Sequence, residues 1–172
     1  MVAGIDYSTK DCHIVEVDEY GTPTRMAFLK FAGKLSTDRL LTVRRTILDD
    51  MWFTGILWRQ VDPVEAIGIE DPRATNPKLR SMIAKLARVQ GAIVQAIPEQ
   101  PSVHFLNAKQ WRTAVGLSGS ASKGDVAGWA IDHGMPEDLA QDYYDAFVIA
   151  RATLLEVSGD VVRSSASESL LD

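Results

Sequence analysis

Two acids, Asp142 and Asp145, stand three residues apart in an apolar segment towards the C-terminal end of the chain. If residues 140–152 form a helix, this spacing places both carboxylates on one helix face. Ala146 and Ile149 mark the same face as the side that packs against a sheet. Buried carboxylates repel each other and lose hydration unless a cation lies between them. The pair therefore predicts half of a metal site, which needs further acids from other elements.

Asp6 and Glu70 each end an apolar segment, residues 2–7 and 64–70, that reads as a β-strand. Functional groups of open sheets gather at the C-terminal ends of strands. If the two strands are neighbours, four acids meet there, and we expect no histidine or cysteine beside them. Oxygen ligands favour Mg²⁺ or Mn²⁺ over zinc. Two such ions, roughly 3.5–4 Å apart, would suit the hydrolysis of a phosphodiester.

The elements that must position these acids are read from hydrophobic periodicity and turn residues. Together they predict an α/β fold with a five-stranded mixed sheet, its first three strands antiparallel, and helices on its faces. We expect one domain over residues 1–157 and a flexible, serine-rich tail over residues 158–172. The predicted strands are 2–7, 12–18, 24–32, 64–70 and 102–106, and the predicted helices are 36–60, 77–97, 107–115, 123–134 and 137–157.

The composition is that of an ordinary globular protein, with 46% hydrophobic and 24% charged residues among 172. No apolar run reaches the roughly 20 residues of a membrane span, and the N-terminus does not resemble a signal peptide. We therefore expect a cytoplasmic protein that binds no membrane. The single cysteine, Cys12, is interpreted as a buried apolar residue and not as a nucleophile.

The charge is unevenly distributed along the chain. Residues 72–124 hold eight basic side chains and one acid, Glu99, although the whole chain carries a net charge of −5. A polarised chain of this kind can present a basic surface to nucleic acid, and an ordinary solvated helix face is the alternative. The predicted DNA contacts are Arg73, Lys78, Arg80, Lys85, Arg88, Lys109, Arg112 and Lys123.

Five segments resemble, in order, the landmarks of the RuvC family of Holliday-junction resolvases: residues 4–6, 69–70, 86–94, 114–126 and 142–150. The resemblance covers about residues 2 to 156, and its most specific parts are the D-x-x-D-A segment and the run that ends at Lys123. It implies an RNase H-like fold with strand order 3-2-1-4-5 and a homodimer with two active sites. It also implies metal-dependent hydrolysis of phosphodiesters at DNA branch points. The divergence indicates a phage-encoded member, which would act in the host cytoplasm.

The resemblance also implies roles for individual residues. Asp6, Glu70, Asp142 and Asp145 match the family's metal-binding acids, which would hold two Mg²⁺ or Mn²⁺ ions. Lys123 matches its catalytic lysine, where a cation would offset the charge that grows on the scissile phosphate. The alternative for Lys123 is a solvated residue at a helix N-terminus, where the helix dipole disfavours a cation.

The chain departs from the family pattern at two places. Tyr7 and Ser8 replace the Pro-Gly that usually follows the first acid, and residues 71–90 contain no aromatic side chain to stack on junction bases. We therefore expect flaps and forks, as well as four-way junctions, among the substrates. Trp111 is a candidate for base stacking, but we expect its indole to pack beneath a short helix instead.

The helix predicted at residues 77–97 has a wider apolar face than a single sheet requires. The excess is interpreted as a dimer seam, because a two-fold dimer would set two sites against the two strands of a junction. Burial of the whole helix in its own domain is the alternative. The predicted seam residues are Leu79, Met82, Ile83, Leu86 and Ile93.

Three other classes of function remain open from the residues. Residues 4–10 also resemble the first phosphate loop of sugar kinases and actin-like ATPases, although the sequence shows no second glycine-rich phosphate loop. A catalytically silent DNA-binding module is another alternative. Other RNase H-like nucleases, acting on RNA–DNA hybrids or transposon ends, are the third. The sequence favours an endonuclease for branched DNA that leaves 5′-phosphate and 3′-hydroxyl ends.

Overall fold

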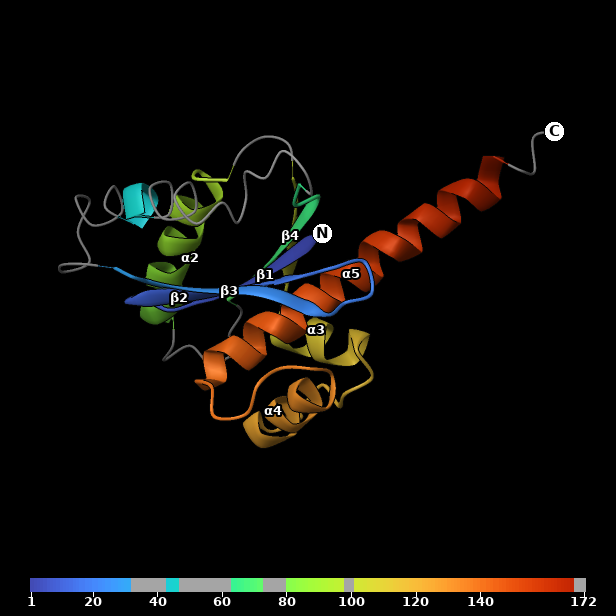
Figure 1. The fold of residues 1–172 in the computed structure, drawn as a ribbon. Helices are drawn as coiled ribbons and strands as arrows, with labels where there is room; N and C mark the ends of the chain where they lie inside the picture. Colours follow the sequence, from blue (N-terminus) through green and yellow to red (C-terminus); the bar gives the residue numbers. More distant parts are fainter. Residues whose placement is uncertain (32–42, 47–62, 73–79, 98–100, 169–172) are drawn as a thin grey trace.

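A five-stranded mixed sheet forms the centre of the computed structural model, which describes residues 1–31, 43–46, 63–72, 80–97 and 101–168 (Figure 1). The strand order is β3-β2-β1-β4-β5. The first three strands pair antiparallel, whereas β4 runs parallel to β1 and β5 parallel to β4. The predicted sheet and strand order are therefore confirmed. The strands are β1 (Val2–Tyr7), β2 (Asp11–Val17), β3 (Pro23–Lys30), β4 (Ala66–Glu70) and β5 (Ser102–Leu106).

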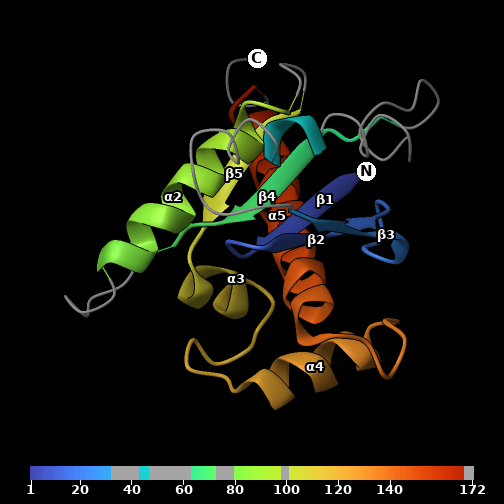
Figure 2. The same ribbon diagram turned by 90° about the vertical axis from the view of Figure 1, so that its left-hand side faces the viewer.

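Helices cover both faces of the sheet. The helix α2 (Arg80–Val94) lies on one face, and α3 (Ala108–Ala114), α4 (Lys123–Asp132) and α5 (Gln141–Glu168) lie on the other (Figure 2). Because side chains alternate along a strand, β1, β2 and β4 each feed two separate cores. Ile5 and Ile69 join the core beneath α2, while Val2 and Val15 join the core beneath α5. This alternation also decides which residues at the strand ends face α5.

Glycines let α5 approach the sheet closely. A Cβ atom at Gly4 would collide with the backbone of Ala146 and Ala150, and one at Gly68 would collide with Thr153. The backbone of α5 therefore lies directly against β1, which brings the first turns of the helix to the ends of the strands.

The start of α5 is held by a tyrosine that ties the preceding loop to the helix. The Tyr144 hydroxyl donates to the Pro136 carbonyl at 3.1 Å and accepts from the Leu139 backbone N–H at 3.1 Å. Tyr144 is itself buried in the core. These contacts fix the direction in which the neighbouring acids leave the helix.

Several helix ends match the prediction, and others differ. Asn107 and Ser122 cap α3 and α4 through capping boxes, in which side chain and backbone satisfy each other's free donors. The helix α5 continues to Glu168 and does not end near Val157 as predicted. The helix predicted at 36–60, apart from residues 43–46, lies outside the described residues, as do Arg73, Lys78 and Leu79. None of the described helices is long and apolar enough to cross a membrane.

Candidate functional site

A row of polar side chains crosses the sheet at the C-terminal ends of β1 and β4. Asp6 on β1 pairs with His13 on β2. Glu70 directly follows Ile69, whose register partner is Ile5, so Glu70 comes next to Asp6. Residues paired across neighbouring strands point to the same face of the sheet. Asp6, His13 and Glu70 therefore all face α5.

The first turns of α5 complete a cluster of acids. One carboxylate oxygen each from Asp6, Asp142 and Asp145 lies within 4.8 Å of the other two. Gln141 donates a hydrogen bond from Nε2 to Asp145 Oδ1 at 3.0 Å, which orients that carboxylate. Asp6 is only 9% exposed, so water cannot screen the cluster fully. The acids predicted from strand ends and from helix spacing are thus brought together.

The electrostatics of this cluster favour a bound cation. Burial raises the pKa of Asp6 well above its usual range, and the nearby charges of Glu70, Asp145 and Asp142 raise it further. Burial likewise raises the pKa of Glu70 and of Asp145. A hydrogen bond between the Asp6 and Glu70 side chains raises the pKa of Asp6 further and partly offsets the rise in the pKa of Glu70. A divalent ion would remove the repulsion among these carboxylates.

Two cationic side chains border the acids. The positive charges of Lys123 and Arg112 both lower the pKa of Asp145, so each lies within electrostatic reach of its carboxylate. Arg112 also lowers the pKa of Glu70. Lys123 is exposed at the first position of α4, whereas Arg112 is half-buried with its guanidinium 4.6 Å from the centre of the Trp111 ring.

The structure corrects the expectations for His13 and Ile93 and confirms those for Trp111 and Cys12. His13 lies in the site, with Nδ1 3.8 Å from Asp142 Oδ2, although no histidine was expected there. Trp111 is 1% exposed, so it packs in the core and offers no surface to a DNA base. Ile93 is fully buried in the core of its own protomer and cannot contribute to a dimer seam. Cys12 is buried, as predicted.

The sequence contains signals that could have placed His13 and Gln141 in the site. His13 follows the turn after β1 at a distance that pairs it with Asp6 in a hairpin, and this register could have placed it in the site. Gln141 stands four residues before Asp145, which is the spacing of side chains that meet on a helix. The role of Arg112 beside Glu70 depends on how α3 packs, and no local pattern predicts it.

A cleft adjoins Glu70 on the side of α2. Its volume is about 580 Å³, and its lining includes Glu70, Met82, Ile83 and Lys109. Met82 is 47% exposed, and Ile83 and Leu86 are half-buried. The other basic residues predicted to contact DNA, Arg80, Lys85 and Arg88, are exposed on α2. The cleft therefore extends from Glu70 to the apolar side chains of α2 and to Lys109 on α3.

A sheet of this order, with acids at the ends of β1 and β4 and on a helix packed across it, defines an RNase H-like fold. No protein-family model and no curated protein sequence matches the chain. Among solved structures, Thermus thermophilus RuvC superimposes with a TM-score of 0.68 at 18% identity, over 92% of this chain and 96% of that one. T. thermophilus RuvC in complex with a Holliday junction substrate gives a TM-score of 0.63 at 17% identity, over 91% and 94% of the two chains. The chain therefore has the RuvC type of RNase H-like fold.

Proposed function

We propose that this protein is a metal-dependent endonuclease of the RuvC type that hydrolyses phosphodiesters in branched DNA. The observation that carries the proposal is the convergence of Asp6, Asp142 and Asp145 beside Glu70 in a RuvC-type fold. The substrates are four-way junctions, with flaps and forks in addition, and the products carry 5′-phosphate and 3′-hydroxyl ends. The T. thermophilus RuvC complex with a Holliday junction supports this class of substrate.

The donor set fits hard divalent cations. Carboxylate oxygens are the ligands that Mg²⁺ and Mn²⁺ prefer, and a bound cation would relieve the burial and mutual repulsion that raise the pKa values of Asp6, Glu70 and Asp145. We assign two ions to Asp6, Glu70, Asp142 and Asp145. When bound, such ions supply activation of water and neutralisation of the leaving oxygen.

The remaining side chains of the site orient groups and balance charge. Gln141 holds the Asp145 carboxylate through its amide hydrogen bond. Lys123, within electrostatic reach of Asp145, would offset the negative charge that develops on the scissile phosphate. Arg112 would attract the same phosphate from the side of Glu70.

The exposed cations on three helices support a path for the DNA backbone. Arg80, Lys85 and Arg88 project from α2, and Lys109 lies at the cleft beside Glu70. Phosphate contacts of this kind supply affinity without base recognition. Arg73 and Lys78 belong to the same proposed surface, although they lie outside the described residues.

A homodimer remains part of the proposal. Met82 is exposed, and Ile83 and Leu86 are half-buried on the same helix, so α2 offers apolar surface that its own core does not cover completely. Pairing of two such helices around a two-fold axis would provide two active sites for the two strands of a junction.

The proposal is tested by incubating purified protein with end-labelled four-way junction, flap and linear duplex in Mg²⁺. We expect cutting of the branched substrates and at least about a hundredfold loss of rate in Asp145→Asn, since removal of a metal ligand removes electrostatic stabilisation of the transition state. Asp132→Asn, which changes an exposed acid at the end of α4, is the matched control and should cut normally.

The outcomes separate the alternatives. Equal cutting by wild type and Asp145→Asn would contradict the assignment of the acids. Absence of cutting on every branched substrate would contradict the nuclease assignment. Preferred cutting of an RNA–DNA hybrid would instead indicate a different RNase H-like specificity.

A further inference from the structure

A second group of candidate ligands lies next to the acid cluster, on the side of β2. One ligand atom each from Asp11, His13 and Asp142 lies within 4.8 Å of the other two. Asp142 belongs to both groups, whereas Asp11 and His13 belong only to the second. This group contains an imidazole nitrogen, and the first group contains oxygen ligands alone.

The His13 ring is held in place from both sides. Its side chain is only 7% exposed, with ring centres 4.9 Å from Phe28 and 4.7 Å from Tyr143. Within the described parts of the chain, no hydrogen bond reaches either ring nitrogen, and the nearest charged group is Asp142. The His13 side chain is thus more than nine-tenths buried, and its Nδ1 faces the Asp142 carboxylate across a gap that no hydrogen bond closes.

The separation of these donors suits an ion between them. Nδ1 of His13 and Oδ2 of Asp142 are 3.8 Å apart, which is too long for a hydrogen bond. Two donors that bind one cation at about 2.0–2.2 Å are themselves about 3–4 Å apart. Asp11 receives a hydrogen bond from the Ser8 hydroxyl on Oδ1, which orients its carboxylate and leaves Oδ2 for a ligand.

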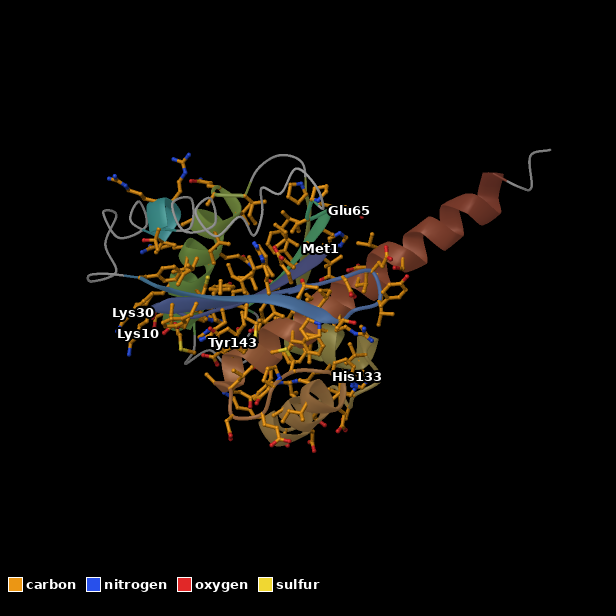
Figure 3. All side chains as sticks on the ribbon, viewed as in Figure 1. Met1, Lys10, Lys30, Glu65, His133 and Tyr143 are labelled. Atoms are coloured by element: carbon orange, nitrogen blue, oxygen red, sulfur yellow. The ribbon has the colours of Figure 1, made fainter. Side chains whose placement is uncertain are left out.

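The group formed by Asp11, His13 and Asp142 is accessible from solvent at Asp142. The Asp142 side chain is 44% exposed. Figure 3 shows Tyr143 below the end of the sheet that is marked by Lys10, in the turn between β1 and β2, and by Lys30, at the end of β3. An ion can therefore reach Asp142 from this edge of the sheet without passing through the core.

We propose that Asp11, His13 and Asp142 form a second cation site that selects transition-metal ions such as Mn²⁺ over Mg²⁺. Imidazole nitrogen binds first-row transition metals well, whereas Mg²⁺ demands oxygen ligands. Asp142 bridges this site to the all-oxygen site of the proposed nuclease. The inference rests on that proposed function only through this shared carboxylate, because ion binding requires neither DNA nor cleavage.

The test uses tag-free full-length protein, Mn²⁺ as the probe, and electron spin echo envelope modulation, which detects ¹⁴N bound directly to Mn²⁺. We expect ¹⁴N modulation in wild-type protein, and its persistence under excess Mg²⁺, because Mg²⁺ displaces Mn²⁺ only from oxygen ligands. In His13→Gln the modulation should disappear, and the Mn²⁺ affinity of this site should fall by about tenfold or more.

Control variants identify the source of the nitrogen. A protein with both His104→Gln and His133→Gln keeps His13 as its only histidine and should retain the modulation. Asp145→Asn should lose an ion from the all-oxygen site, but it should retain the ¹⁴N modulation. Wild-type protein that binds Mn²⁺ without ¹⁴N modulation would overturn the inference, as would loss of the modulation in the double variant. Nuclease activity together with absent modulation would refute this site alone, whereas modulation without activity would refute only the proposed function.

Discussion

Replacement of Asp6 by asparagine tests two properties of the acid cluster separately: the destabilisation of the metal-free fold and the binding of metal ions. Asn has nearly the shape of Asp, and its amide can donate a hydrogen bond to the neighbouring Glu70. Burial and the charges of Glu70, Asp145 and Asp142 raise the pKa of Asp6 in the folded protein. Its charged form therefore destabilises the metal-free fold. We expect Asp6→Asn to raise the stability of metal-free protein at neutral pH.

The sign of the pH dependence follows from linkage. Because the folded pKa of Asp6 lies above the unfolded value of about 4, the folded state binds the proton more tightly. The stability that Asp6 contributes is thus complete below about pH 4 and is lost as pH rises towards the folded pKa. Within that window the advantage of Asp6→Asn should grow by up to about 1.4 kcal/mol per pH unit. At pH 3 the two proteins should differ little.

Divalent metal ions should reverse this order of stability, so that wild type gains more than Asp6→Asn. A ligand present at a hundred times its dissociation constant stabilises the folded state by about 2.7 kcal/mol. For a chain of this size that corresponds to a rise in Tm of about 5–11 °C. Wild type should show this rise in Mg²⁺ or Mn²⁺, whereas Asp6→Asn should show little of it, because one of the clustered oxygen ligands is replaced by an amide.

The assay is thermal unfolding followed by circular dichroism between pH 3 and pH 8, with EDTA or with divalent ion. Asp132→Asn, exposed on α4, is the control and should follow wild type in both conditions. An Asp6→Asn variant that is less stable than wild type at pH 8 in EDTA would refute the electrostatic reasoning. An undiminished rise in Tm with metal would refute the role of Asp6 as a ligand.

Three further changes test the packing, the DNA surface and the dimer. Gly4→Ala should lower Tm by about 2–12 °C and abolish the metal-induced rise, because the added Cβ pushes α5 from β1; Gly128→Ala, with open space around it, should do neither. Replacing Lys85 and Arg88 by Gln should reduce the slope of log binding constant against log salt concentration by up to about 1.8. An unchanged slope would mean that neither side chain contacts a DNA phosphate. Met82→Lys should convert a dimer into monomers in light scattering, and an intact dimer would place the seam elsewhere.

Local patterns in the sequence were sufficient to predict most of the fold. The strands β1 and β4 are short apolar runs, buried along nearly their whole length, that each carry an acid near the C-terminal end, so the strands and the placement of Asp6 and Glu70 were predictable from the sequence. Asn107 and Ser122 are side chains whose capping chemistry acts within three residues, and both helix starts were predicted correctly. The spacing of Asp142 and Asp145 indicated a metal site for the same reason, since helix geometry alone places them on one face.

Tertiary structure decided which groups join the acids and which do not. The partner of Asp6 on β2 depends on hairpin register, so His13 entered the site without any motif of its own. Ile93 and Trp111 have residue types that suit an interface or a stacking surface, but the direction of α2 and α3 against the sheet buries them. The approach of α5 depends on Gly4, whose small size matters only because Ala146 and Ala150 lie against it. The contacts that bury Ile93 and Trp111 and that seat α5 on Gly4 join segments far apart in the chain, and no short-range pattern encodes how they pack.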